Sequence, residues 1–175
     1  MISINSNERW AVIYFFVLML VFSFGTSITR SLAMTLLVQH MGGEVLPYIF
    51  IMIDGIAMFA FFAYANYSKK IAELRLLSIL FMVAILYLSS LLICIHVFEF
   101  VWLYAAIFVG FFICFIMITT HMGTFFAAYF TTIQLKRVTY VINLGLPIGG
   151  MLGGASLVLL LQYISEPESL MALTV

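Results

Sequence analysis

Charged residues are scarce in this sequence: aspartate, glutamate, lysine and arginine make up 8% of its 175 residues. Hydrophobic residues make up 66%, and they form long apolar runs separated by short polar clusters. A water-soluble fold could not bury so much apolar surface, so the composition predicts an all-α integral membrane protein. The seven basic and seven acidic residues give a net charge of zero. No basic cluster is large enough to predict nucleic-acid binding.

Cysteine and catalytic clusters are scarce as well. The two cysteines, Cys94 and Cys114, lie in different apolar runs, and their expected depths on neighbouring helices argue against a disulfide. Small buried hydrophobic residues are the simpler interpretation of both. The sequence shows no nucleophile with a base, no cluster of metal ligands and no phosphate-binding loop at a workable spacing. We therefore expect a protein that is not an enzyme and that needs no metal or cofactor.

The apolar runs predict a single transmembrane domain, residues 1–175, with five spans and the start of a sixth helix at residues 169–175. The expected spans cover about 10–39, 47–66, 74–95, 101–134 and 138–163. The first and fourth exceed the roughly 20 residues that a bilayer core requires, so they must tilt, bend or protrude. Pro47 suits the first turn of the second helix, where its missing N–H costs nothing.

The distribution of charge predicts the orientation. With five spans, all basic residues except Arg30 fall on the side of the N-terminus: Arg9, Lys69, Lys70, Arg75, Lys136 and Arg137. Four acidic residues fall on the opposite side: Glu44, Glu99, Glu166 and Glu168. Short cytoplasmic loops retain lysine and arginine, so the N-terminus is predicted to be cytoplasmic.

Two charges, Arg30 and Asp54, stand inside apolar runs. Ionisable groups cost several kcal/mol in hydrocarbon, so those found there usually pair or line an aqueous cavity. Each lies about ten residues from the turn between the first two helices, or roughly 15 Å along a helix axis. Their similar depth favours an ion pair or a shared binding site. The alternative is structural: Arg30 extends to the interface and Asp54 forms a local hydrogen bond.

Hydroxyl-bearing residues form stripes on the first and fourth helices, and each stripe should face protein or water. The first stripe consists of the hydroxyl-bearing Ser23, Thr26 and Ser27, and Arg30 continues it. The second consists of Thr120, Thr124 and Thr131. His121, beside the second stripe, is a further candidate for a cavity wall, although a lone histidine on an apolar helix is more often structural.

Glycines form the strongest pattern of the fifth span. Gly145, Gly149 and Gly153 repeat every four residues, which gives a groove where another helix backbone can approach closely. Gly150 widens the groove, and Pro147 adds a site for a kink. Two interpretations stay open: close packing within the five helices, or a moving interface with another part of the protein.

The order of the spans, the basic second loop, and the sequence Leu-Lys-Arg-Val-Thr-Tyr-Val-Ile-Asn-Leu-Gly-Leu-Pro-Ile-Gly-Gly at 135–150 resemble the N-terminal half of a major facilitator superfamily transporter. Within that superfamily, residues 29–48 are similar to the ATP/ADP translocase branch of nucleotide carriers. Arg30 and the Gly42, Glu44 and Pro47 turn match that branch. Where the branch has a lysine and an aspartate, this sequence has Ala33 and Met34.

The resemblance implies a major-facilitator-like fold in a bacterial inner membrane, with two six-helix halves that rock around a central site. The second half would come from a C-terminal continuation or another copy of the chain. Helices one and four would line the cavity, and helix five would slide against the other half. The expected solute is small and anionic, with nucleotides among the candidates. The expected binding residues are Arg30, Asp54, Thr26, Ser27, His121, Thr120 and Thr124.

The alternative is a scaffold, assembly factor or sensor protein that keeps the transporter fold without transporting anything. Ala33 and Met34, in place of the lysine and aspartate, favour this alternative, as does the scarcity of charge.

Overall fold

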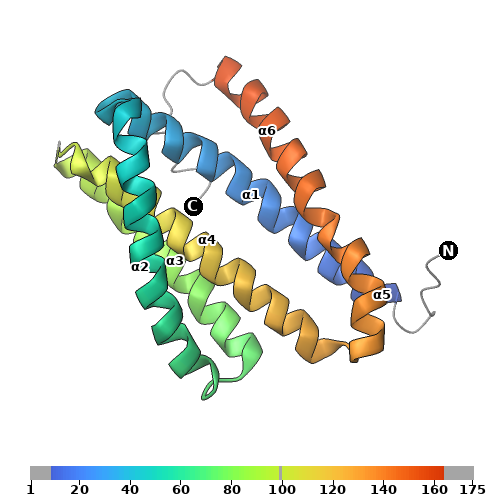
Figure 1. The fold of residues 1–175 in the computed structure, drawn as a ribbon. Coiled ribbons are helices and arrows are strands. Elements are labelled where there is room, and N and C mark those ends of the chain that lie inside the picture. The colour runs from blue at the N-terminus through green and yellow to red at the C-terminus, as the bar shows by residue number, and fades with distance from the viewer. Residues whose placement is uncertain (1–8, 99, 164–175) are drawn as a thin grey trace.

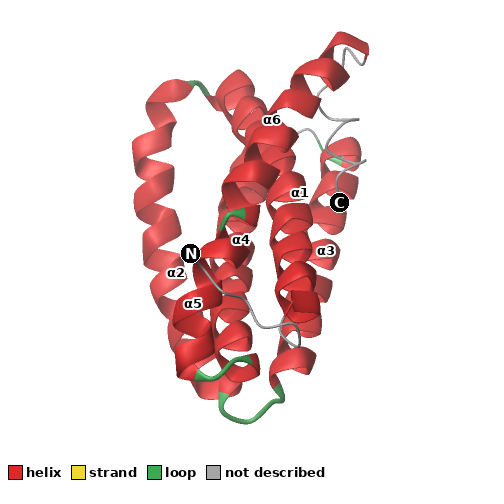
Figure 2. Ribbon diagram, turned by 90° about the vertical axis from the view of Figure 1, so that its right-hand side faces the viewer, coloured by secondary structure: helices red, strands yellow, loops and turns green. Residues whose placement is uncertain are grey.

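The computed structural model describes residues 9–98 and 100–163, and within these ranges every regular element is a helix (Figure 2). The elements are α1 (Arg9–Met41), η1 (Gly43–Val45), α2 (Leu46–Ser68), α3 (Glu73–Val97), α4 (Trp102–Tyr129), α5 (Thr132–Asn143) and α6 (Gly145–Tyr163) (Figure 1). Five stretches are long and apolar enough to cross a membrane, α5 and α6 together forming the fifth. The all-α class is confirmed, and the five apolar helices fit a membrane protein. The expected start of a sixth helix lies outside the described residues.

The turn between α1 and α2 follows from its glycines and proline. Gly42 has φ 80°, a left-handed conformation that favours glycine, and its N–H donates to Val38 O, which ends α1. Pro47 lies in the first turn of α2, where no hydrogen bond requires its missing N–H. The chain therefore reverses within a few residues, as the sequence predicts.

The fourth helix ends earlier than expected. We expected it to reach Gln134, but α4 ends at Tyr129 and the backbone of Phe130 is extended. Thr131 caps α5: its hydroxyl accepts from Gln134 N–H, and the Gln134 side chain accepts from Thr131 N–H. This reciprocal capping box satisfies two donors that a helix start otherwise leaves open. Thr131 is thus a cap and leaves the stripe expected on α4.

The fifth span differs from its expected range of 138–163 in two ways. Helix begins at Thr132, so Lys136 lies within α5, and the chain passes from α5 to α6 at Leu144. Pro147 follows three residues later, where it can offer no N–H to the carbonyl of Asn143. A proline near the junction thus accounts for two helix segments in place of one.

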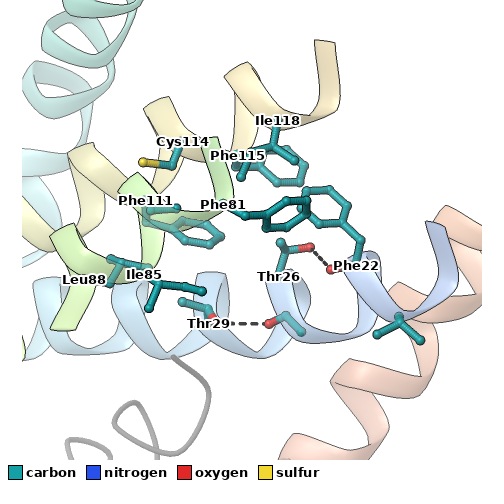
Figure 3. A pocket seen from close by; sticks show the side chains of 13 residues that line it. Phe22, Thr26, Thr29, Phe81, Ile85, Leu88, Phe111, Cys114, Phe115 and Ile118 are labelled. Atoms are coloured by element: carbon teal, nitrogen blue, oxygen red, sulfur yellow. Dashed lines mark hydrogen bonds between the residues drawn. The ribbon is translucent and has the colours of Figure 1, made fainter. Parts of the chain in front are cut away.

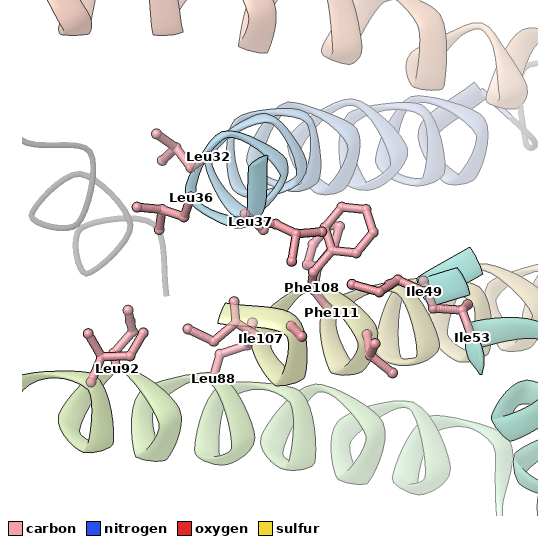
Figure 4. Close-up of a cluster of buried hydrophobic side chains, with 14 of the residues drawn as sticks. Leu32, Leu36, Leu37, Ile49, Ile53, Leu88, Leu92, Ile107, Phe108 and Phe111 are labelled. Atoms are coloured by element: carbon pink, nitrogen blue, oxygen red, sulfur yellow. The ribbon is translucent and has the colours of Figure 1, made fainter. Parts of the chain in front are cut away.

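Two core clusters hold the bundle together. In the first, α1 and α4 meet α2 and α3 (Figure 4), through Leu32, Leu36, Leu37, Ile49, Ile53, Leu88, Leu92, Ile107 and Phe108. In the second, α1 and α4 meet α5, through Phe15, Met19, Met122, Phe126, Val138 and Ile142. α1 and α4 are therefore the central helices, while α3 packs mainly on α4 and leaves much of its apolar surface exposed.

Candidate functional site

α6 crosses α1 of the same chain (Figure 1), and the backbone of α1 fills the glycine groove of α6. A Cβ atom at Gly145 would lie 2.6 Å from Phe16 O, and one at Gly153 would lie 2.6 Å from Phe24 O. At Gly149 a Cβ would collide with Leu20 O. Because backbone opposes backbone along three turns, only glycine permits this approach. Close packing within the bundle thus accounts for the groove.

Serine hydroxyls join the same two helices. Ser23 Oγ donates to Leu146 O, and Ser27 Oγ donates to Gly150 O at 3.1 Å. In a bilayer such bonds hold helices together, since lipid offers the hydroxyls no partner. The expectation that Ser27 lines a substrate cavity does not match this geometry, because its hydroxyl faces α6.

Arg30 and Asp54 do not form the expected ion pair. Both side chains are exposed, and among the described residues no carboxylate lies within ion-pair distance of Arg30. The Arg30 guanidinium instead lies over the ring of Phe112 in α4, with Cζ 5.4 Å from the ring centroid. Phe50 of α2 contacts the same ring, with a centroid distance of 6.1 Å. Arg30 of α1 and Phe50 of α2 thus both contact Phe112 of α4, and no described ion pair joins Arg30 to Asp54.

These side chains share one side of the bundle. Asp54 follows Phe50 by four residues and so lies on the same side of α2. Thr120, which is exposed, follows Phe112 by eight residues on the same stripe of α4. We call Arg30, Phe50, Asp54, Phe112 and Thr120 the Arg30 face. It offers a cation, an anion and a hydroxyl beside an aromatic surface.

Thr26 lies elsewhere, in a hollow of about 280 Å³ between α1, α3 and α4 (Figure 3). Its hydroxyl donates to Phe22 O at 2.9 Å, and the neighbouring Thr29 donates to Gly25 O at 3.0 Å. The rest of the lining is apolar and includes Phe22, Phe81, Phe111 and Phe115. This hollow suits an apolar group, and an anionic solute would find no charge in it.

His121 is fully buried, with 0% of its surface exposed, between the ends of α2, α3 and α4. Its Nε2 lies 2.7 Å from Glu73 O, and its Nδ1 lies 2.8 Å from the hydroxyl of Tyr64. Glu73 Oε2 is 3.6 Å from Nδ1. Thr124 donates to His121 O at 2.8 Å. His121 and Thr124 therefore belong to a contact between helix ends rather than to a cavity wall beside Arg30.

The predicted binding residues thus divide among four places: the α1–α6 interface, the apolar hollow, the Arg30 face and the His121 contact. Sequence reasoning missed Tyr64, Glu73 and Phe112. No spacing relates residues 64, 73 and 121, since each comes from a different helix, and Phe112 is one of many phenylalanines on α4. Among residues 9–98 and 100–163 no group of three or more histidine, cysteine, aspartate or glutamate side chains is placed to hold a metal ion.

Over the part of the chain that the structure describes, the geometry defines an all-α protein with five helices long and apolar enough to cross a membrane. Comparison with known proteins goes no further: no family model, no curated protein and no solved structure matches the chain.

Proposed function

We propose that this chain is part of a membrane transporter that moves a small anionic solute by alternating access, with Arg30 as the anchor for the negative charge. The proposal rests mainly on the position and contacts of Arg30. It is an exposed guanidinium within the apolar span of α1, and no carboxylate of the described residues pairs with it. A charge kept at such a position without a carboxylate partner among the described residues is explained by a ligand or an aqueous path.

The surroundings of Arg30 suit this role. The Phe112 ring holds the guanidinium through a cation–π contact, and leaves its N–H groups free to donate to a carboxylate or phosphate. Asp54 and Thr120 on the same face supply an acceptor and a hydroxyl for other groups of the solute.

The pairs of helices that pack on each other support the proposal that this chain is half of a transporter. Halves of major facilitator transporters contain inverted repeats of three helices, which relate the first span to the fourth and the second to the fifth. The repeat therefore pairs two contacts: if the first span packs on the fifth, the fourth span should pack on the second in the same way. Here α1 packs on α6 and α4 packs on α2, while α1 and α4 contact each other.

The proposal includes a second half and an orientation. The partner half, from a longer chain or a second copy, would cover the Arg30 face and enclose the solute. One end of the bundle, which we call the basic end, carries Lys69, Lys70, Arg75 and Lys136. In a bacterial inner membrane this end would be cytoplasmic.

Uptake into liposomes by the full-length protein tests the proposal, against panels of nucleotides, other organic anions and peptides. Arg30→Gln should lower uptake of the transported anion roughly 10- to 100-fold, the value of a lost charge-assisted hydrogen bond. Arg30→Lys should retain more uptake than Arg30→Gln, because lysine keeps the positive charge but loses the forked hydrogen-bond geometry of the guanidinium. Lys69→Gln, an exposed lysine at the basic end, is the matched control. Unchanged uptake in Arg30→Gln would contradict the assignment.

One observation favours the alternative of a scaffold or sensor. The hollow beside Arg30 is lined by α1 alone, through Ser31, Met34, Thr35, Val38 and Gln39, and is therefore an open surface to which a helix of another protein can bind. A scaffold predicts that cysteines placed on this surface crosslink to a partner protein, and that no member of the solute panel is taken up.

A further inference from the structure

The contact around His121 has a chemistry that the proposed function does not use. Three helices meet there, with Tyr64 in the last turns of α2, Glu73 in the first turn of α3, and His121 near the end of α4. Lys69 and Lys70, in the turn that joins α2 to α3, place the contact at the basic end of the bundle.

The hydrogen bonds determine which ring nitrogen carries the proton. A backbone carbonyl can only accept, so the 2.7 Å contact with Glu73 O requires a hydrogen on Nε2. In the neutral ring Nδ1 is then an acceptor, and the Tyr64 hydroxyl at 2.8 Å is its donor. The Thr124 hydroxyl, 3.3 Å from Nδ1, already donates to His121 O. A second proton can bind only at Nδ1.

Glu73 is positioned to stabilise that second proton. Its Oε2 is 3.6 Å from Nδ1, and 43% of its side chain is exposed, so it links the buried ring to water. Proton uptake turns a neutral contact into an ion pair between α4 and the first turn of α3, and the Tyr64 oxygen can then accept. The apolar cluster around this part of α4 includes Phe15 and Met19 from α1 and Val138 and Ile142 from α5, and α5 also carries the half-buried Arg137.

We infer that His121 is a proton-binding site that controls how firmly the α2–α3 turn is held against α4. When Nδ1 is protonated, the ion pair with Glu73 adds to the Nε2–H bond to Glu73 O, and the turn is held by both. When the proton leaves, the ion pair is lost and the turn opens more readily. The inference stands without transport activity; under the proposed function, the same step would make exchange at the basic end depend on pH.

Nuclear magnetic resonance of the full-length protein with labelled histidine rings tests proton binding directly, with the His121 signal identified by its loss in His121→Gln. The signal should change with pH as Nδ1 binds and releases a proton. Glu73→Gln removes the carboxylate but keeps the carbonyl, so the protonated ring loses its ion-pair partner and the midpoint of the change should differ from that of the parent protein. Glu44→Gln, a carboxylate at the opposite end, should leave it unchanged. Absence of titration, or an unchanged midpoint in Glu73→Gln, would overturn the inference.

Thiol labelling tests the consequence for the turn. In protein with Cys94→Ala and Cys114→Ala, the labelling rate of Ser68→Cys is divided by that of Thr132→Cys at the same end, which cancels the pH dependence of the reagent. The ratio should rise roughly twofold to fivefold from pH 5.5 to 8. The rise should vanish in His121→Gln, whose amide still donates to Glu73 O, and shrink in Glu73→Gln. A ratio that does not change with pH would overturn the inference even if solute transport were found.

Discussion

The α1–α6 interface and the Arg30 face differ in how closely α1 meets its neighbour. At the interface, helices whose bonded residues are 123 positions apart touch backbone to backbone, through glycines and two serine bonds. At the Arg30 face, Arg30 of α1 and Phe50 of α2 both contact the Phe112 ring of α4. Removing side chains brings helices together, whereas charge and aromatic bulk leave a surface open. The closely packed α1–α6 interface and the exposed Arg30 face thus both involve α1.

The largest effect should come from filling the closest contact. Gly149→Leu places a side chain where even a Cβ atom collides with Leu20 O, and a backbone cannot yield as a side chain can. We expect a loss of about 3 kcal/mol in the free energy of unfolding in detergent, or failure to fold. Gly154→Leu is the matched control, because nothing lies within 4 Å of a Cβ at that position. Equal stability of the two variants would show that α6 does not pack on α1 in this way.

The glycine pattern also shows what sequence reasoning can reach. A missing side chain is visible in the sequence, so the groove of Gly145, Gly149 and Gly153 could be predicted, but the helix that fills it could not. Spacing along one helix contains no information on which distant backbone approaches it. The end of α4 was missed for another reason: the run stays apolar beyond Tyr129, and the Thr131 and Gln134 capping box, a visible signal, was outweighed by hydrophobicity.

A smaller effect should follow from removing one hydroxyl of the interface. Ser27→Ala deletes the bond to Gly150 O and leaves the glycine contacts intact, so we expect a loss of about 0.6 kcal/mol. Ser90→Ala, which removes an exposed hydroxyl bonded within α3 to Tyr87 O, should cost less. Chemical unfolding of both variants measures the difference. A loss in Ser27→Ala no larger than in Ser90→Ala would show that glycine packing alone holds the interface.

The smallest effect is expected at the Arg30 face, in a double-mutant cycle of Arg30→Gln and Asp54→Asn. Residue counts along α1 and α2 give both charges a similar expected depth, because each residue of a helix adds about 1.5 Å. Phe112, which Arg30 and Phe50 both contact, belongs to a third helix, and no count along α1 or α2 reveals it. With no ion pair to break, the two losses of stability should add to within about 0.5 kcal/mol.

The cycle of Glu73→Gln and His121→Gln at pH 5.5 is the positive control, since these groups lie 3.6 Å apart. A coupling above about 1 kcal/mol between Arg30 and Asp54 would mean that the two helices close over Phe112, and Arg30 would then have a partner within the chain rather than in the solute.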